Sequence, residues 1–161
     1  RQGDFPEDYD QWLSALQVGA RAGKPESFIL DWRDRPNRLT RRDTRYKREA
    51  FDHCKKHHLL KGPLRDTRKI ILWGVGQTGK PWLTWLLKEG FEIPYAIDVS
   101  PKKMGKCIHG VEVISPEQVR RIYDPELFVL AAVGAYGARE KIAGYLKQLG
   151  CIPGKNLWFV A

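Results

Sequence analysis

The segment Lys69-Ile-Ile-Leu-Trp-Gly-Val-Gly-Gln-Thr-Gly79 decides the fold of this chain. Its first five residues form a short apolar run, which predicts a strand covered on both faces of a parallel sheet. The glycines that follow are spaced as Gly-x-Gly-x-x-Gly, and the apolar periodicity from Trp82 to Leu87 predicts a helix after them. A second strand at 93–97 ends at Asp98. The order strand, glycine loop, helix, strand, acid is that of a dinucleotide-binding unit.

The residues beyond Asp98 continue the alternation of strands and helices. Further strands are predicted at 110–114, 127–133 and 157–160, with helices after Ser115 and after a second glycine loop, Gly134-Ala-Tyr-Gly137. We therefore predict an α/β fold: a Rossmann-like parallel sheet of about five strands flanked by helices, preceded by a mainly helical or irregular N-terminal segment. Right-handed crossovers would place the loops after the first and fourth strands side by side, where such sheets bind ligands.

The first glycine loop suits the binding of a phosphate group. Its first glycine allows a tight turn, its second allows the backbone to approach a phosphate, and its third allows close helix–sheet packing. Asp98 stands where an acid accepts hydrogen bonds from a ribose diol. We predict that a nucleotide or nucleotide sugar is contacted by Gly74, Gly76, Gln77, Thr78, Gly79, Asp98, Gly134 and Tyr136. The alternative is a loop that is kept for its turn and binds nothing.

Two enzyme classes that use glycine loops do not fit this sequence. Gly74-x-x-x-x-Gly79-Lys80 matches a P-loop up to its last position, but Pro81 stands where Ser or Thr would hold Mg²⁺. We therefore reject a nucleoside triphosphatase. A dehydrogenase is disfavoured because no Tyr-x-x-x-Lys pair or similar catalytic set occurs, and because 69–161 leave no second domain for a substrate.

Length and composition limit the class of protein. The 161 residues are 42% hydrophobic, enough for a packed core, and the three cysteines show no pairing pattern. A reducing compartment is the simpler interpretation, so we predict a cytoplasmic location. The longest apolar run, 127–133, is too short to span a membrane. The chain starts at Arg1 in what reads as mid-domain sequence, and we expect it to be a fragment.

A basic stretch lies between an acidic start and the Rossmann-like part. Residues 33–68 carry 13 lysines and arginines against 5 acids, within a formal net charge of +9. No recognised nucleic-acid module matches, so we expect no nucleic-acid partner, while weak attraction to acidic lipid headgroups stays open. With a helix predicted at 47–61, the chain divides into a start at 1–40, a basic helical linker at 41–68 and the Rossmann-like domain at 69–161.

The linker helix carries four side chains of metal-ligating type, His53, Cys54, His57 and His58. Their i, i+4 spacings place pairs of ligands on one face of a helix, as in zinc sites. No other clustered ligands complete such a site, and the two lysines between Cys54 and His57 repel a cation. We therefore predict no metal site.

The acidic start of the chain carries a candidate general base. Phe5-Pro-Glu-Asp-Tyr-Asp-Gln-Trp-Leu13 places carboxylates, among them Glu7 and Asp8, at the beginning of a predicted helix. There they complement the positive end of the helix dipole. An exposed carboxylate in this position can also deprotonate an alcohol nucleophile.

This segment, together with Leu30-Asp-Trp-Arg-Asp-Arg-Pro-Asn-Arg-Leu-Thr40, resembles the end of the catalytic domain of family 2 glycosyltransferases. The resemblance implies that Asp8 deprotonates the acceptor hydroxyl, with Glu7 beside it. It also implies the C-terminal part of a bacterial enzyme that transfers a sugar from a nucleotide-sugar donor. Arg35 stands where a later segment of the family often has histidine, which argues against metal ligation by that segment.

Ile70 to Lys80 is similar to the start of a Rossmann-like tail domain in some bacterial members. It is also similar to the nucleotide-sugar-binding domain of bacterial sugar acetyltransferases. The resemblance implies an accessory binding or assembly domain, compatible with a homo-oligomer.

The front of the GT-A domain, where the divalent metal is expected, is missing from this sequence. We therefore expect an upstream GT-A domain as partner and no sugar transfer by this piece alone. The alternatives are a non-catalytic module that binds NAD or a nucleotide sugar, and a purely structural interaction domain.

Overall fold

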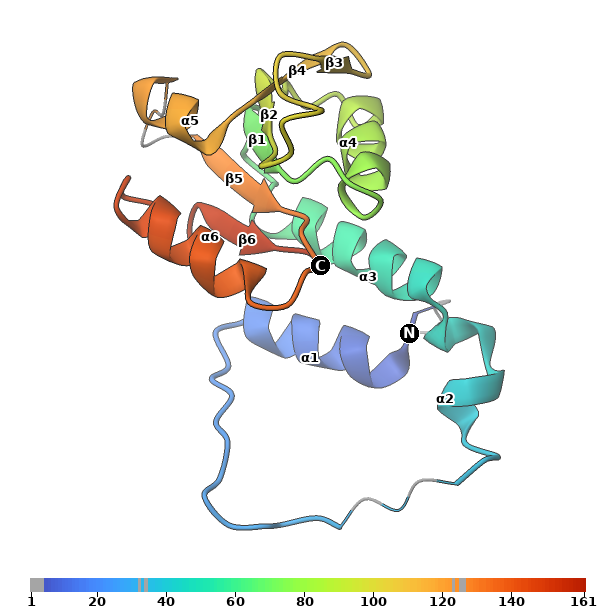
Figure 1. The fold of residues 1–161 in the computed structure, drawn as a ribbon. Helices are drawn as coiled ribbons and strands as arrows, with labels where there is room; N and C mark the ends of the chain where they lie inside the picture. The colour runs from blue at the N-terminus through green and yellow to red at the C-terminus, as the bar shows by residue number, and fades with distance from the viewer. Residues whose placement is uncertain (1–4, 32, 34, 123, 125–126) are drawn as a thin grey trace. The chain divides into compact units, whose positions relative to one another are not determined.

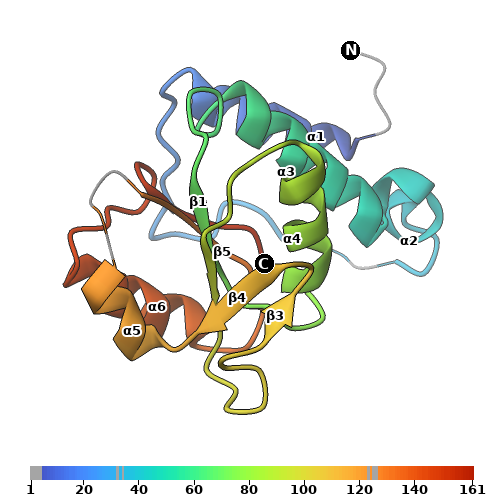
Figure 2. The ribbon, with the colours of Figure 1, turned by 90° about the horizontal axis from the view of Figure 1, so that it is seen from above.

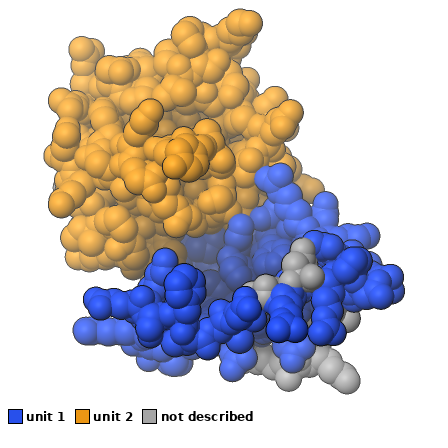
Figure 3. Space-filling view, turned by 60° about the horizontal axis from the view of Figure 1, so that its bottom comes forward, with its two compact units in different colours: residues 1–65 blue, residues 66–161 orange. Residues whose placement is uncertain are grey.

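The chain divides into two compact units, residues 1–65 and 66–161 (Figure 3). The computed structural model describes residues 5–31, 33, 35–122, 124 and 127–161. Trp32 and Asp34, which belong to the segment that resembles glycosyltransferases, lie outside the described residues. Each unit is described by itself.

The first unit is helical. Its elements are α1 (Glu7–Gln17), α2 (Leu39–Arg42), the 3₁₀ turn η1 (Thr44–Tyr46) and α3 (Arg48–Lys61). α1 lies alongside α3 (Figure 1), and the rings of Tyr9 and Phe51 meet between them at a centroid distance of 5.1 Å. The acids predicted at the start of α1 do fall in its first turn, where they complement the helix dipole.

The segment from residue 18 to 31 forms neither helix nor strand. Three consecutive large apolar side chains in it, Phe28, Ile29 and Leu30, are exposed. A run of this kind is uncommon on a free surface and is typical of a segment that packs against another surface.

The second unit is a six-stranded sheet flanked by helices, which confirms the predicted Rossmann-like fold. Its strands are β1 (Ile70–Trp73), β2 (Tyr95–Ile97), β3 (Cys107–Ile108), β4 (Val111–Ile114), β5 (Phe128–Ala131) and β6 (Leu157–Phe159). Its helices are α4 (Gly79–Lys88), α5 (Pro116–Ile122) and α6 (Ala138–Lys147). The strand order is β3-β4-β2-β1-β5-β6, and all neighbours are parallel except β3 and β4.

The centre of the sheet is fully buried because helices cover both of its faces. α5 and α6 lie over one face and α4 lies over the other (Figure 1 and Figure 2). Every residue of β1 and β5 is buried, with Leu72 paired to Leu130. Continuous apolar strands of this kind are what a two-sided parallel sheet requires.

The structure adds one strand to the five that the sequence predicts. Cys107 pairs with Glu112 and Ile108 with Val111, so β3 and β4 form an antiparallel hairpin. Its two turn residues, His109 and Gly110, have φ of 51° and 82°. Two positive φ values in succession are the mark of a type I′ hairpin turn. A two-residue strand is too short for the alternation of side chains to reveal it.

β1 is the strand at which the chain reverses its direction across the sheet. β2 and β4 lie on one side of β1, whereas β5 and β6 lie on the other. Because β1 and β5 are parallel neighbours, the loops that follow them lie side by side at the carboxyl edge of the sheet, as predicted. In open α/β sheets this switch point is where ligands bind.

Candidate functional site

A cavity of about 630 Å³ opens at the carboxyl ends of β1 and β5. Its volume is within the range of sites for small molecules and cofactors. Both glycine loops border it. The residues of the sequence prediction that line it are Gly74, Gly76, Gln77, Thr78, Asp98 and Gly134.

The three glycines of the first loop have different surroundings. Gly74 has φ +98°, and a Cβ there would lie 2.5 Å from Val133 Cγ2. A Cβ on Gly79 would lie 1.8 Å from the carbonyl oxygen of Gly74, so the first turn of α4 packs directly on the loop. A Cβ on Gly76 would meet only Lys103 Nζ, at 3.8 Å. The fold therefore requires glycine at 74 and 79 but leaves the space over Gly76 open to a ligand.

Asp98 is buried and anchors the loop to the end of β2. Its carboxylate accepts hydrogen bonds from Val75 N at 3.1 Å, Ser100 N at 2.9 Å and Lys103 Nζ at 2.8 Å. Burial by itself raises the pKa of Asp98, but the bonds from Lys103, Ser100 and Val75 outweigh burial, so its pKa is lowered. An ionised carboxylate offers about four lone-pair sites, so the three bonds leave about one for a ribose hydroxyl, and a second becomes available if Lys103 moves away.

Lys103 is a residue of the site that sequence reasoning missed. It lies in the turn after β2, ion-paired to Asp98 and close to Gly76. With Lys141 it gives the cavity two positive charges against the one negative charge of Asp98. A signal was present, because the segment Lys102-Lys103 follows the acid at the end of β2 within a few residues. The balance of charge favours an anionic ligand.

Apolar and aromatic side chains from β1, α6 and the loop after β5 line part of the cavity. Trp73 and Tyr145 meet edge to face at 5.6 Å between ring centroids. Val133 and Ile142 continue this lining from β5 toward α6. A site that combines cations and backbone amides with apolar and aromatic side chains suits a ligand that joins an anionic group to a planar ring.

The two remaining predicted contacts lie outside the lining of this cavity. Gly79 lies behind the loop, against the carbonyl of Gly74. Tyr136 is fully exposed and borders a separate hollow of about 600 Å³ with Gly137 and Arg139. The prediction that the second glycine loop faces the same crevice therefore holds for Gly134, whereas the Tyr136 side chain borders the neighbouring hollow.

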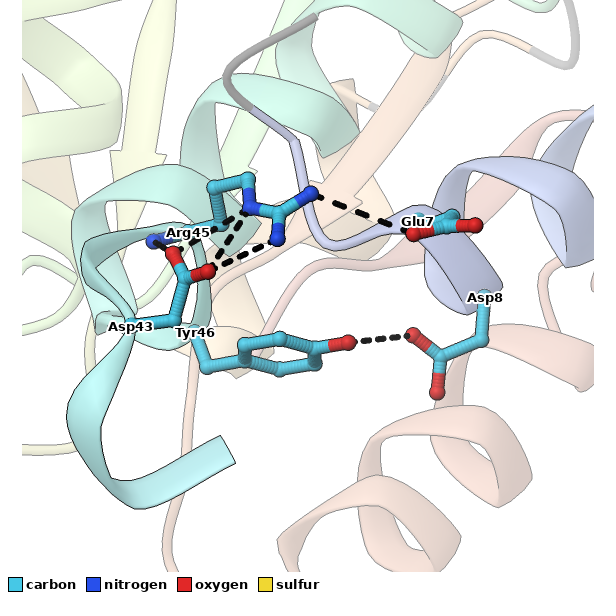
Figure 4. A network of polar contacts seen from close by, with 5 residues as sticks. All are labelled: Glu7, Asp8, Asp43, Arg45 and Tyr46. Carbon is cyan, nitrogen blue, oxygen red and sulfur yellow. Dashed lines mark hydrogen bonds and ion pairs between the residues drawn. The ribbon is translucent and has the colours of Figure 1, made fainter. Parts of the chain in front are cut away.

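In the first unit, the candidate base Asp8 belongs to a small polar network (Figure 4). The hydroxyl of Tyr46 donates to Asp8 Oδ1 at 3.4 Å, and Arg45 Nη1 lies 3.9 Å from Glu7 Oε2. Arg45 is held by Asp43, with Nη2 2.7 Å from Oδ2. The carboxylates of α1 thus contact η1, which follows α2.

Three pKa values of this network are shifted. The Arg45 guanidinium holds the pKa of Asp43 below its usual range, and Asp43 in turn raises the pKa of Arg45. Burial, followed by the charge and the hydrogen bond of Asp8, raises the pKa of Tyr46. Tyr46 therefore stays a neutral donor to the carboxylate. A hollow of about 300 Å³ beside it is lined by Asp8, Tyr9, Trp12, Thr40, Tyr46 and Phe51.

The four side chains of metal-ligating type on α3 separate into two groups. His53 and His57 pack against the Phe5 ring, at centroid distances of 5.1 and 5.3 Å. Cys54 and His58 are buried and face Asp10 of α1. Sequence spacing identified these two, but the carboxylate beside them comes from another helix, which a local pattern does not show.

None of the helices in the described part of the chain is both long and apolar enough to cross a membrane. This agrees with the short apolar runs in the sequence.

No family model and no curated protein matches the chain. Among solved structures it is similar to RSP, a Rex-family repressor, over 68% of this chain at 19% identity and a TM-score of 0.52. RSP in complex with β-NADH matches over 68% at 20% identity and a TM-score of 0.50. RSP in complex with β-NAD⁺ and operator DNA matches over 66% at 22% identity and a TM-score of 0.47.

The chain spans about half the length of these solved structures, 53%, 53% and 50% respectively. At this level of identity the likeness shows the fold alone. It places the described sheet and its helices among Rossmann-like folds.

This comparison corrects one sequence prediction. We excluded nucleic acid as a partner because no recognised nucleic-acid module matches the basic stretch. RSP, which shares the Rossmann-like fold at a TM-score of 0.52, is a repressor. The exclusion is therefore wrong, because the absence of a recognised nucleic-acid module does not rule out this class of partner for such a fold.

Proposed function

We propose that the second unit, residues 66–161, is a nucleotide-binding module that holds a dinucleotide or a nucleotide sugar and performs no chemistry on it. The observation that carries the proposal is the cavity at the switch point between β1 and β5, bordered by both glycine loops. This is the position at which open α/β sheets bind nucleotides.

The surroundings of Gly76 support a phosphate at this point. The space over its Cα is open, Lys103 Nζ lies beside it, and no side chain caps the first turn of α4 in the described structure. Backbone amides at a helix start together with a lysine stabilise a negative charge. Asp98, Trp73 and Tyr145 line the same cavity, which supports a ribose near the carboxylate and a base or sugar near the rings.

The comparison with a repressor solved in complex with β-NADH supports NADH as one ligand to test. The sequence resemblance to sugar acetyltransferases supports a UDP-sugar as another. The three cysteines are present as thiols, which supports the cytoplasmic location predicted from the sequence.

Isothermal titration of the chain with NADH, NAD⁺, CMP and UDP-sugars tests the proposal. We expect saturable binding of at least one of them, weakened about 10-fold or more by Gly76→Ala, because a methyl group that displaces a phosphate costs about 1–3 kcal/mol. Gly144→Ala is the matched control, since a Cβ there lies in open space on α6. Absence of saturable binding for all four ligand classes would overturn the proposal in favour of a purely structural interaction domain.

A second candidate function concerns the first unit: the end of a family 2 glycosyltransferase domain. We infer it from the sequence resemblance, and two observations support it. Asp8 lies beside a hollow lined by aromatic side chains, which commonly contact sugars, and Phe28, Ile29 and Leu30 are exposed as if a covering surface were absent. Sugar transfer by the full-length protein should be abolished by Asp8→Asn. Unchanged turnover in that variant would refute the assignment of the base.

A further inference from the structure

Asp10, Cys54 and His58 form a buried cluster between α1 and α3. One potential ligand atom from each lies within 4.8 Å of those of the others. His58 Nε2 is 2.7 Å from Asp10 Oδ1, and Cys54 Sγ is 3.9 Å from the same oxygen. Cys54 is 0% exposed and His58 is 6% exposed, whereas the Asp10 side chain is 20% exposed, so water reaches the cluster from the side of α1.

Gln17 determines which nitrogen of His58 carries a hydrogen. Its Nε2 donates to the backbone carbonyl of His58 at 2.8 Å, so its Oε1 must be the atom that lies 3.1 Å from His58 Nδ1. Because an amide oxygen only accepts, Nδ1 carries a hydrogen. The neutral ring then directs the lone pair of Nε2 at the carboxylate of Asp10. At this separation a proton bridges the two atoms in a hydrogen bond. A metal ion bound by both would replace that proton, with the two atoms about 0.6 Å farther apart.

We propose that this cluster binds a divalent cation of the zinc class, with His58 Nε2, Cys54 Sγ and Asp10 Oδ1 as ligands and a fourth position open to water. Nitrogen, thiolate and carboxylate ligands are the donors that Zn²⁺ takes in tetrahedral sites. Cys54 and His58 are one helical turn apart on α3, the spacing that directs two ligands to one side. The proposal departs from the sequence prediction of no metal site, because that prediction lacked the carboxylate from α1.

The surroundings of the cluster fit a cation. The hydrogen bond from His58 Nδ1 to Gln17 is the outer contact that metal-bound histidines ordinarily make. Lys55, which the sequence suggested would repel a metal, lies 3.6 Å from the carboxylate of Asp52. Binding would release the proton shared by His58 and Asp10 and the proton of the Cys54 thiol, so that the two negative charges of thiolate and carboxylate balance the cation.

Titration of the reduced, metal-stripped chain with Co²⁺ tests the site. We expect one equivalent to produce the d–d bands of tetrahedral cobalt and a thiolate-to-cobalt charge-transfer band, and Zn²⁺ to displace both. The apparent melting temperature of the first unit should rise with either metal, because a ligand that binds only the folded state stabilises it. Cys54→Ser should abolish the charge-transfer band, and His58→Gln should weaken binding more than 10-fold.

Cys107→Ser is the matched control, since Cys107 is exposed on β3 in the other unit and should not affect the spectrum. The wild-type spectrum decides the matter even if a variant at the cluster fails to fold. Folded wild-type protein that shows no charge-transfer band would overturn the proposal. A band that persists in Cys54→Ser, or that disappears in Cys107→Ser, would do the same.

Discussion

Gly79→Ala is the substitution that tests most directly how the glycine loop is built. A Cβ at this position would lie 1.8 Å from the carbonyl oxygen and 2.6 Å from the carbonyl carbon of Gly74. Atoms this close must separate by more than 1 Å. Gly74 has little room to move, because its N–H donates to Ile97 O at 2.7 Å and its own Cα is closely surrounded by residues 132 and 133.

We expect Gly79→Ala to lower the free energy of unfolding of the second unit by about 2 kcal/mol. Overpacking by a methyl group costs about 1–3 kcal/mol, and the very short contact places this case at the upper end. The gain in helix propensity at the first position of α4 offsets at most about 1 kcal/mol of that cost. With an m-value of about 1.5 kcal/mol per M, the midpoint in urea should fall by about 1.3 M.

Urea unfolding followed by near-ultraviolet circular dichroism measures this effect, since Trp82 is buried in the second unit and should report on it. Gly76→Ala in the same loop is the internal comparison. Its Cβ meets only the flexible end of Lys103, so its free energy of unfolding should stay within about 0.5 kcal/mol of that of the wild type. Equal midpoints for Gly79→Ala and wild type would refute the close approach of α4 to the loop.

Two further predictions concern the same unit. Asp98→Asn should destabilise it by about 2 kcal/mol, because an amide group would face N–H donors that a buried carboxylate now satisfies. Since the pKa of Asp98 is lowered in the folded state, the wild-type advantage should be complete above its ordinary pKa of 3.8 and lost as the pH falls through the folded value. Urea midpoints measured against pH check this, and an advantage that persists in strong acid would contradict it. Gly144→Ala, in open space on α6, should raise stability by about 1 kcal/mol in the same assay, and a lower midpoint would show that the helix surface is more crowded than described.

The fold of the second unit could be predicted because its signals are local. Apolar runs at β1 and β5 mark strands buried on both faces, and glycines mark the turns that follow them. Chain connectivity with right-handed crossovers then places the two loops together. The strand β3 was missed because two residues carry no periodicity, although His109-Gly110 between the apolar residues Ile108 and Val111 was a turn signal.

The site was predicted less completely because side-chain partners depend on tertiary distances. The position of Asp98 after β2 suggested a ribose acceptor, but nothing in its spacing showed that Val75, Ser100 and Lys103 already bond to its carboxylate. Asp10 and His58 are far apart in sequence, and their contact needs the packing of α1 on α3. Only the structure supplies such pairs.

The three cysteine thiols differ in exposure, and the alkylation rate of a buried thiol can be used to measure local unfolding of its unit. Cys54 is buried in the first unit and Cys151 in the second, whereas Cys107 is exposed. A thiol inside a packed core reacts with an alkylating reagent only when its surroundings open, so its rate of modification measures local unfolding. The exposed Cys107 gives the alkylation rate of a thiol that reacts without any local unfolding, which is the reference for the other two. The protein therefore carries one buried probe for each unit and an internal reference, without any introduced label.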